Sequence, residues 1–152
     1  MNNPTSDNRK AYFDYTIGDK YEAGIALYGW EVKSARAGNV NLKDSFIDFK
    51  TIFNGRPQAF LKNAHISTYE YGNVAEQEVR RPRRLLLNRS EINKIAHAVM
   101  AKGYTCVATK LYFKGGRIKL EIALARGKHN YDKKQAEKER AMEREARELV
   151  LP

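Results

Sequence analysis

The chain has 152 residues, with 28 Lys or Arg against 18 Asp or Glu, and its formal net charge is +10. It has no apolar run near the roughly 18 residues that a membrane helix needs and no secretory signal pattern, so we expect a soluble, cytoplasmic protein without a membrane partner. A single cysteine, Cys106, excludes an intramolecular disulfide framework and a cysteine-based zinc cluster.

The positive charge is unevenly distributed. From residue 132 onward six basic and six acidic side chains cancel, so the whole surplus lies on residues 1–131. A body this basic favours phosphate binding through counterion release. The apolar stripe of residues 132–152 is too narrow to bury, so we expect this tail to be disordered when free and helical only against a partner. The expected division is a flexible arm over residues 1–8, one domain over 9–131 and a tail over 132–152.

The first half of the domain carries strand patterns around one short helix. Alternation from Tyr12 to Leu27 predicts one long strand. Residues 29–38 are bracketed by glycines and suit a short helix. Residues 45–53 and 59–66 predict a hairpin around Asn54-Gly55, whose register Pro57 leaves open. Glu22 is either a carboxylate on an edge strand or an acceptor for base edges and 2′-hydroxyls.

Five arginines then fall within ten residues, and they surround a proline and precede three leucines: Arg80, Arg81, Arg83, Arg84 and Arg89. A solvated loop before a buried strand is the ordinary explanation, and it would place Leu86 in the core. In so basic a body the cluster favours phosphate contact.

A helix and a second hairpin complete the domain. Asn88 is a suitable helix cap, Glu91 stands at the third position, and Gly103 supplies a left-handed stop. A two-residue turn at Gly115-Gly116 predicts a hairpin in one register. That register brings apolar residues together on the buried face and pairs opposite charges on the other face. The predicted facing pairs are Phe113 with Ile118, Leu111 with Leu120, Thr109 with Ile122, Val107 with Leu124, Tyr112 with Lys119, and Lys110 with Glu121.

Tyr112 and Lys119 allow two interpretations. An aromatic ring beside a cation on a sheet can stack an exposed base and hold its phosphate. An ordinary solvent-facing pair is equally compatible with the spacing.

Several strands and one substantial helix predict a mainly β fold, a small antiparallel barrel with flanking helices. The oligonucleotide-binding (OB) type is the obvious candidate, although composition does not distinguish it from other small all-β folds.

Enzymatic signals are weak. The three histidines share no metal-ligand spacing, and no nucleophile triad or phosphate loop is present. The best candidate is Asp14 or Asp19 with Glu31 and Lys33, which faintly resembles the acid and Glu-x-Lys arrangement of metal-dependent nucleases. Such triplets are common by chance, so a nuclease stays an alternative only, and we expect no cofactor and no metal. A generic ribosomal or cold-shock-like RNA binder, with a merely solubilising tail, is a third hypothesis.

Seven short segments, in order and spacing, resemble the small protein B (SmpB) family of bacterial tmRNA-binding proteins. They are residues 21–27 (YEAGIAL), 29–38 (GWEVKSARAG), 43–46 (KDSF), 84–88 (RLLLN), 102–105 (KGYT), 111–114 (LYFK) and Gly127-Lys128. The resemblance implies a six-stranded OB-type barrel with flanking helices and no enzymatic activity. It also implies binding to the tRNA-like domain of tmRNA, and we expect the protein to be a monomer. With elongation factor Tu, the family carries tmRNA into ribosomes stalled on messages lacking a stop codon, in trans-translation.

The resemblance also assigns residues. Family tmRNA contacts map onto Asn8, Glu22, Leu86 and Lys119. For Leu86 the resemblance either overrules the expected core position or implies that the residue serves both the core and the RNA contact. Tyr112 and four of the arginines (80, 81, 83 and 84) complete the predicted tmRNA-binding set.

In the family the tail enters the empty message channel and becomes helical beside the decoding centre, against small-subunit ribosomal RNA. The predicted ribosome contacts here are Lys128, His129, Tyr131, Asp132, Lys133, Lys134, Leu149 and Val150. His129 stands where the family usually has lysine, so a permanent positive charge is absent there. Lys134 stands where the family has arginine, so the planar guanidinium with its paired donors is absent.

Overall fold

The computed structural model describes residues 6–51, 56–67 and 76–127, which form nine strands and four helices. In chain order these are β1 (Ser6–Asp7), α1 (Arg9–Asp14), β2 (Tyr15–Ile25), α2 (Gly29–Arg36), β3 (Val40–Asn41), β4 (Phe46–Thr51), β5 (Pro57–Lys62), β6 (His65–Ile66), α3 (Glu76–Val79), β7 (Arg83–Leu86), α4 (Arg89–Ala101), β8 (Thr105–Lys114) and β9 (Arg117–Gly127). No helix in these ranges is both long and apolar enough to cross a membrane.

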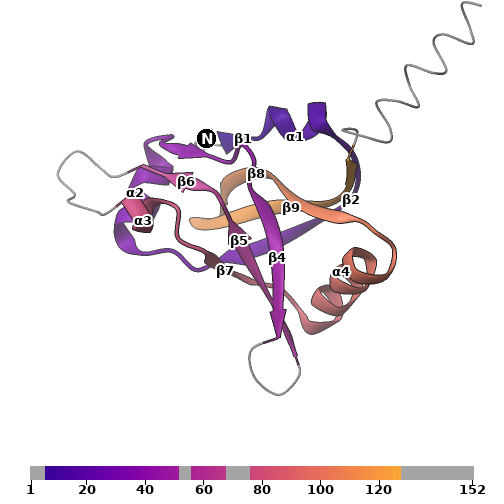
Figure 1. Cartoon of the computed structure of the whole chain (residues 1–152). Coiled ribbons are helices and arrows are strands. Elements are labelled where there is room, and N and C mark those ends of the chain that lie inside the picture. The colour runs from indigo at the N-terminus through magenta and orange to yellow at the C-terminus, as the bar shows by residue number, and fades with distance from the viewer. Residues whose placement is uncertain (1–5, 52–55, 68–75, 128–152) are drawn as a thin grey trace, which may run out of the picture.

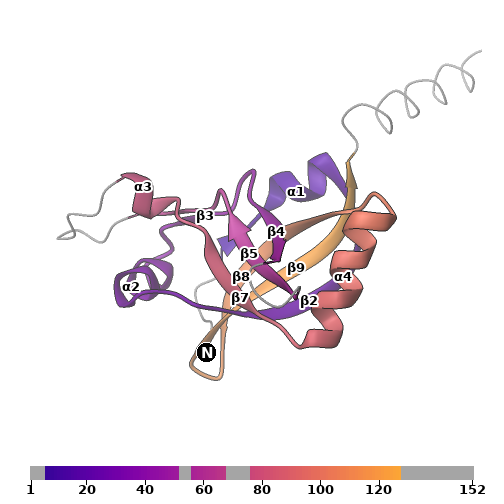
Figure 2. The same ribbon diagram turned by 60° about the horizontal axis from the view of Figure 1, so that its bottom comes forward.

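Seven strands form one antiparallel sheet in the order β1-β8-β9-β2-β7-β5-β4, and β3 pairs with β6 in a separate two-stranded ribbon. The sheet curls, because β4 at one edge crosses close to β8 near the other edge (Figure 1). Helices α2 and α3 lie at one end of the curled sheet and α4 at the other (Figures 1 and 2). The predicted mainly β, antiparallel class is confirmed. The sheet has one strand more than the expected six, because residues 6 and 7 pair with β8.

The inner face of the curled sheet forms the core. Ala23 and Ile25 of β2, Leu120 and Ile122 of β9, and Ile95 of α4 are buried there. Burial alternates along the second half of β2, so Glu22 and Gly24 stand on the outer face. The apolar inner face therefore fixes which side chains of β2 are presented to solvent.

The N-terminal region differs from the prediction. Residues 9–14 form α1, so the strand begins at Tyr15 rather than Tyr12. Asn8, expected in a loose arm, is 4% exposed and caps this helix, since its Oδ1 accepts from the N–H of Ala11 at 3.2 Å. The capping asparagine therefore explains why the chain turns into a helix here.

The first hairpin is confirmed, and its register is now defined. Thr51 pairs with Pro57, so five residues connect the strands instead of a two-residue Asn-Gly turn; residues 52–55 lie outside the described ranges. The expected second strand ends at Lys62, and His65–Ile66 pairs separately with β3.

The second hairpin follows the prediction near its turn. Gly115 and Gly116 have φ of +57° and +78°, as a two-residue turn with mirror-image geometry requires. The four pairs nearest the turn among those predicted are confirmed, namely Phe113 with Ile118, Tyr112 with Lys119, Leu111 with Leu120, and Lys110 with Glu121.

Beyond these pairs the register shifts at a β-bulge between Ala108 and Lys110, so the predicted pairs of Thr109 with Ile122 and Val107 with Leu124 are wrong. Ala108 faces Ile122 instead. The extra residue is Thr109, whose Oγ1 donates to Glu121 Oε2 at 2.7 Å. The bulge lets Ala108 and Leu111 both point into the main core.

Both predicted helices are confirmed. The N–H of Asn88 donates to Glu91 Oε1 at 3.3 Å at the start of α4, and Gly103 follows its end with φ of +73°. Helix α2 begins in the same way, because the N–H of Tyr28 donates to Glu31 Oε1 at 2.8 Å.

Candidate nucleic-acid interface

Three neighbouring strands present a row of side chains on the outer face of the sheet. Gly24 of β2 pairs with Lys119 of β9 on one side and with Leu86 of β7 on the other. Glu22 precedes Gly24 by two residues and stands on the same face. Because β2 lies inside the sheet, the prediction that Glu22 belongs to an edge strand is wrong.

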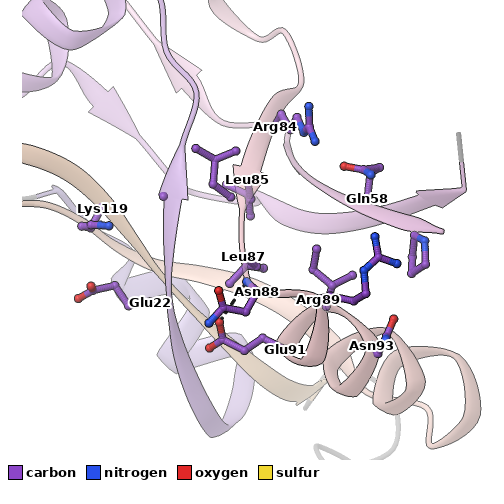
Figure 3. Close-up of a pocket in the computed structure, with 14 residues that line it drawn as sticks. Glu22, Gln58, Arg84, Leu85, Leu87, Asn88, Arg89, Glu91, Asn93 and Lys119 are labelled. Atoms are coloured by element: carbon purple, nitrogen blue, oxygen red, sulfur yellow. Dashed lines mark hydrogen bonds between the residues drawn. The ribbon is translucent and has the colours of Figure 1, made fainter. Parts of the chain in front are cut away.

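This row opens into a cavity of about 490 Å³ between the sheet and the start of α4. Its lining includes Glu22, Gly24, Leu86 and Lys119, with Gln58 from β5. Figure 3 shows Glu22 and Lys119 on one side of the cavity and Gln58 on the other. The cavity therefore combines a carboxylate, an ammonium group and an apolar side chain that come from three strands.

The carboxylate of Glu22 is held in place by its neighbours. The Tyr112 hydroxyl donates to its Oε2, and Lys114 Nζ lies 3.4 Å from the same oxygen. The Tyr112 hydrogen bond lowers the pKa of Glu22, with Lys114 and Lys119 adding to the effect and partial desolvation opposing it. Burial and the bond to Glu22 raise the pKa of Tyr112. Glu22 is therefore an ionised acceptor with a fixed orientation.

The Tyr112 ring does not line this cavity. It lies instead in contact with Lys110 Nζ, 5.3 Å from the ring centroid. The structure thus gives Tyr112 a hydrogen-bonding contact with Glu22 in addition to its cross-strand pairing with Lys119. Its expected stacking on a base stays a prediction.

Leu86 is 56% exposed, so the prediction from its leucine run that it belongs to the core is wrong. Burial along β7 alternates, with Arg83 and Leu85 inside and Arg84 and Leu86 outside. This alternation turns Leu86 toward the cavity, and its contact with tmRNA stays a prediction.

The arginine cluster separates into two groups. Arg80, Arg84 and Arg89 are exposed, and the last two line the cavity. Arg83 is completely buried, so its predicted phosphate contact is wrong. Its Nε donates to Glu31 Oε2 at 2.7 Å, because a guanidinium inside the fold needs a counter-charge. Arg81 donates to Glu31 Oε1 and stacks on Tyr28, its guanidinium carbon 3.9 Å from the ring centroid, so it too is largely engaged within the protein.

These contacts overturn the nuclease alternative. Both oxygens of Glu31 are bound to arginines, and its side chain is 0% exposed. A carboxylate so engaged has no lone pair directed at solvent for Mg²⁺. In the described part of the chain no three His, Cys, Asp or Glu side chains gather as a metal site would require. Asp14, Asp19 and Lys33 therefore form no catalytic group with Glu31.

Asn8 lies apart from the cavity. Its Nδ2 donates to the carbonyls of Leu42 at 3.0 Å and Ala108 at 2.7 Å, and its Oδ1 caps α1. All polar atoms of the side chain are thus used inside the protein. The expected direct tmRNA contact is not available in this conformation, and Asn8 instead joins α1 to the sheet.

The eight predicted ribosome-contacting residues, from Lys128 to Val150, lie outside the described residues. Sequence reasoning missed Gly24 and Gln58 as lining residues. A glycine inside a strand pattern was the available signal for Gly24, because it marks a close approach of another group. No local signal distinguishes Gln58.

Comparisons with known proteins agree with one another. The family model described as "SmpB protein" matches residues 5–151. An SsrA-binding protein of Thermoanaerobacter pseudethanolicus is 52% identical over 130 residues, which cover 86% of this chain and 80% of the relative. The SsrA-binding protein of Caldicellulosiruptor saccharolyticus is 51% identical over 143 residues, covering 94% and 87%. A solved structure described as "tmRNA-SmpB: a journey to the center of the bacterial ribosome" aligns with a TM-score of 0.66 at 44% identity, covering 86% of this chain and 88% of the other.

Proposed function

Because the chain belongs to the SmpB protein family, we propose that it is the tmRNA-binding adaptor of trans-translation. Its relatives are named SsrA-binding proteins, and the similar solved structure is described by tmRNA, SmpB and the bacterial ribosome. In this role the chain binds the tRNA-like domain of tmRNA and delivers it to stalled ribosomes. The family is one of RNA-binding adaptors and not of enzymes, so no catalytic residue is assigned.

The observation that carries the proposal is the convergence of Glu22, Leu86 and Lys119 on one cavity. They stand on three different strands and far apart in the sequence, yet the family resemblance selected all three. A shared surface is what a common RNA contact requires.

The chemistry of the cavity suits folded RNA. Lys119, Arg84 and Arg89 offer cations for phosphates, which fix the position of the RNA. Glu22 offers an acceptor for base N–H groups or a 2′-hydroxyl, which only RNA carries. Leu86 offers apolar surface to a base. The 22 basic against 12 acidic residues before residue 132 add long-range attraction to phosphate.

The finer assignments belong to the same proposal. Residues 9–131 bind tmRNA, and residues 132–152, which lie outside the described ranges, enter the empty message channel near the decoding centre. The equal numbers of opposite charges in this tail favour recognition by shape. We further propose a cytoplasmic monomer that reaches the ribosome with elongation factor Tu through the tmRNA complex.

Binding to a transcript of the tRNA-like domain tests the proposal. Glu22→Gln and Lys119→Gln should each weaken binding at least about tenfold, since a hydrogen bond to a charged group contributes about 1.5–3 kcal/mol. Lys33→Gln is the matched control, because it removes the same charge as Lys119→Gln from an exposed position on helix α2. If all three variants bind as tightly as the wild-type chain, the RNA binds outside this cavity.

Incubation with structured RNA and Mg²⁺ tests the discarded alternative directly. The RNA should stay intact with and without chelator. Chelator-sensitive cleavage would contradict the adaptor assignment and support a nuclease.

A further inference from the structure

Gly24 occupies the centre of the row on the outer face of the sheet, where a side chain would otherwise stand. Cross-strand neighbours on one face stand side by side, so Lys119 and Leu86 flank Gly24 directly. The absence of a side chain at this position leaves room between them.

Space, not backbone conformation, requires a glycine here. Gly24 is not among the positive-φ glycines of the described chain. A Cβ atom at this position would lie 3.2 Å from Leu86 Cβ, 3.5 Å from its Cδ1 and 3.7 Å from its Cγ. The side chain of Leu86 therefore lies against Gly24, and a Cβ there would push it back by a few tenths of an ångström.

This close approach gives Leu86 a defined orientation despite its 56% exposure. The surrounding rim is polar, with Glu22 and Lys119 lining the same cavity. An apolar surface of one side chain, framed by a carboxylate and a cation, suits the face of a single nucleobase whose polar edge reaches the rim. In an RNA helix both faces of a base are stacked, so only an unstacked base offers a free face.

We infer that Gly24 is a positioning residue, which lets Leu86 lie flat across β2 and form the platform for an unstacked nucleobase of tmRNA; this role rests on the proposed function. Glu22 and Lys119 then contact the edge or the phosphate of that nucleotide. Replacing Gly24 with any larger residue should lift Leu86 from the sheet and weaken RNA binding through Leu86 alone.

The test uses the full chain and a tRNA-like domain transcript at one salt concentration. Gly24→Ala should weaken binding about fivefold to tenfold, comparable with Leu86→Ala, which removes most of one apolar contact. In the Leu86→Ala background, Gly24→Ala should change affinity by less than about twofold, because the apolar surface for the base is already absent. The contact with the Cβ of residue 86, which alanine keeps, should then change the urea midpoint and not the RNA affinity.

Two other glycines give matched controls. Gly18 lies on the same strand, and a Cβ there would meet the Leu124 carbonyl oxygen at 3.2 Å, so Gly18→Ala crowds β2 outside the cavity. A Cβ added at Gly29 would have nothing within 4 Å, so Gly29→Ala adds a methyl group without crowding. Both variants should keep wild-type RNA affinity. Gly18→Ala should do so even if it lowers the urea midpoint of unfolding.

A measurement on the unmodified chain keeps the inference testable if Gly24→Ala unfolds. The δ-methyl NMR signals of Leu86 should move upfield when the transcript is added, since a base face lies over them. Unmoved methyl signals, or the same loss from Gly24→Ala with and without Leu86, would overturn the inference while leaving tmRNA binding intact. Failure of the wild-type chain to bind the transcript would overturn the proposed function as well.

Discussion

Glu31→Gln should destabilise the fold severely, because Glu31 balances two arginines inside the protein. Its Oε2 accepts from Arg83 Nε at 2.7 Å, and its Oε1 accepts from Arg81 and from the N–H of Tyr28. Neither Glu31 nor Arg83 is exposed. The neutral amide would leave the buried guanidinium of Arg83 without its counter-charge and would turn an N–H₂ group toward donors.

The magnitude follows from burial. Removing one partner of a buried ion pair costs about 3–5 kcal/mol, because the other charge stays desolvated and unpaired. Arg83 also donates to the carbonyls of Ala64 at 2.7 Å and Val79 at 2.9 Å, and these contacts place the expected loss near the lower end of that range. With a urea dependence of about 1–3 kcal/mol per M, the unfolding midpoint should fall by about 2 M.

Urea unfolding followed by fluorescence measures this loss, since the single tryptophan, Trp30, precedes Glu31 on α2. Glu22→Gln is the matched control, and this exposed substitution should change the free energy of unfolding by less than about 0.5 kcal/mol. If Glu31→Gln lowers the free energy of unfolding no more than the control does, Glu31 is not the counter-charge of Arg83.

Three further outcomes are expected. The pKa of Glu22 lies below the ordinary 4.5, so the ionised carboxylate that accepts from Tyr112 is fully present above pH 4.5 and is lost as the pH falls through the lowered pKa. Tyr112→Phe should raise the pKa of Glu22 in a carboxyl-carbon NMR titration. An unchanged titration midpoint would contradict the hydrogen bond. Lys119→Gln should reduce the slope of log affinity against log salt by about one, and an unchanged slope would mean that Lys119 contacts no phosphate. Burial raises the pKa of the Cys106 thiol to about 12, so a thiol reagent at pH 8 should label the protein only after unfolding; rapid native labelling would show that β8 opens readily.

Local signals predicted the elements that depend on local interactions. The turn at Gly115-Gly116 and the cap of α4 at Asn88 need only neighbouring residues, and both were predicted correctly. Helix α1 was missed because its adjacent aromatic residues, Tyr12 and Phe13, continue the aromatic and aliphatic stretch that predicted a strand. Its cap, Asn8, is held by a carbonyl 100 residues away, that of Ala108.

The remaining errors have long-range causes. The bulge at Thr109 depends on a hydrogen bond to Glu121 across the hairpin, which no alternation pattern reveals. The burial of Arg83 depends on Glu31, 52 positions earlier in the chain. Composition can indicate that arginines bind phosphate, but only the fold shows which of them already has a partner.

The candidate site was predictable in parts. Glu22 stood out as a charge among apolar neighbours, and the hairpin register placed Lys119 beside Tyr112. That Glu22 and Lys119 share a cavity with Leu86 follows from the order of β9, β2 and β7 in the sheet, which sequence patterns do not specify. The role of Gly24 depends on a contact of one side chain across strands.

The central claim is a division of labour between a body that binds tmRNA and a tail that acts on the ribosome. A chain ending at Tyr131 tests it most directly, in a reconstituted reaction that measures both affinity for tmRNA and tagging of peptides on stalled ribosomes. The account predicts tmRNA affinity close to that of the full chain and no tagging. Tagging at the full-length rate, or a large loss of tmRNA affinity, would contradict it.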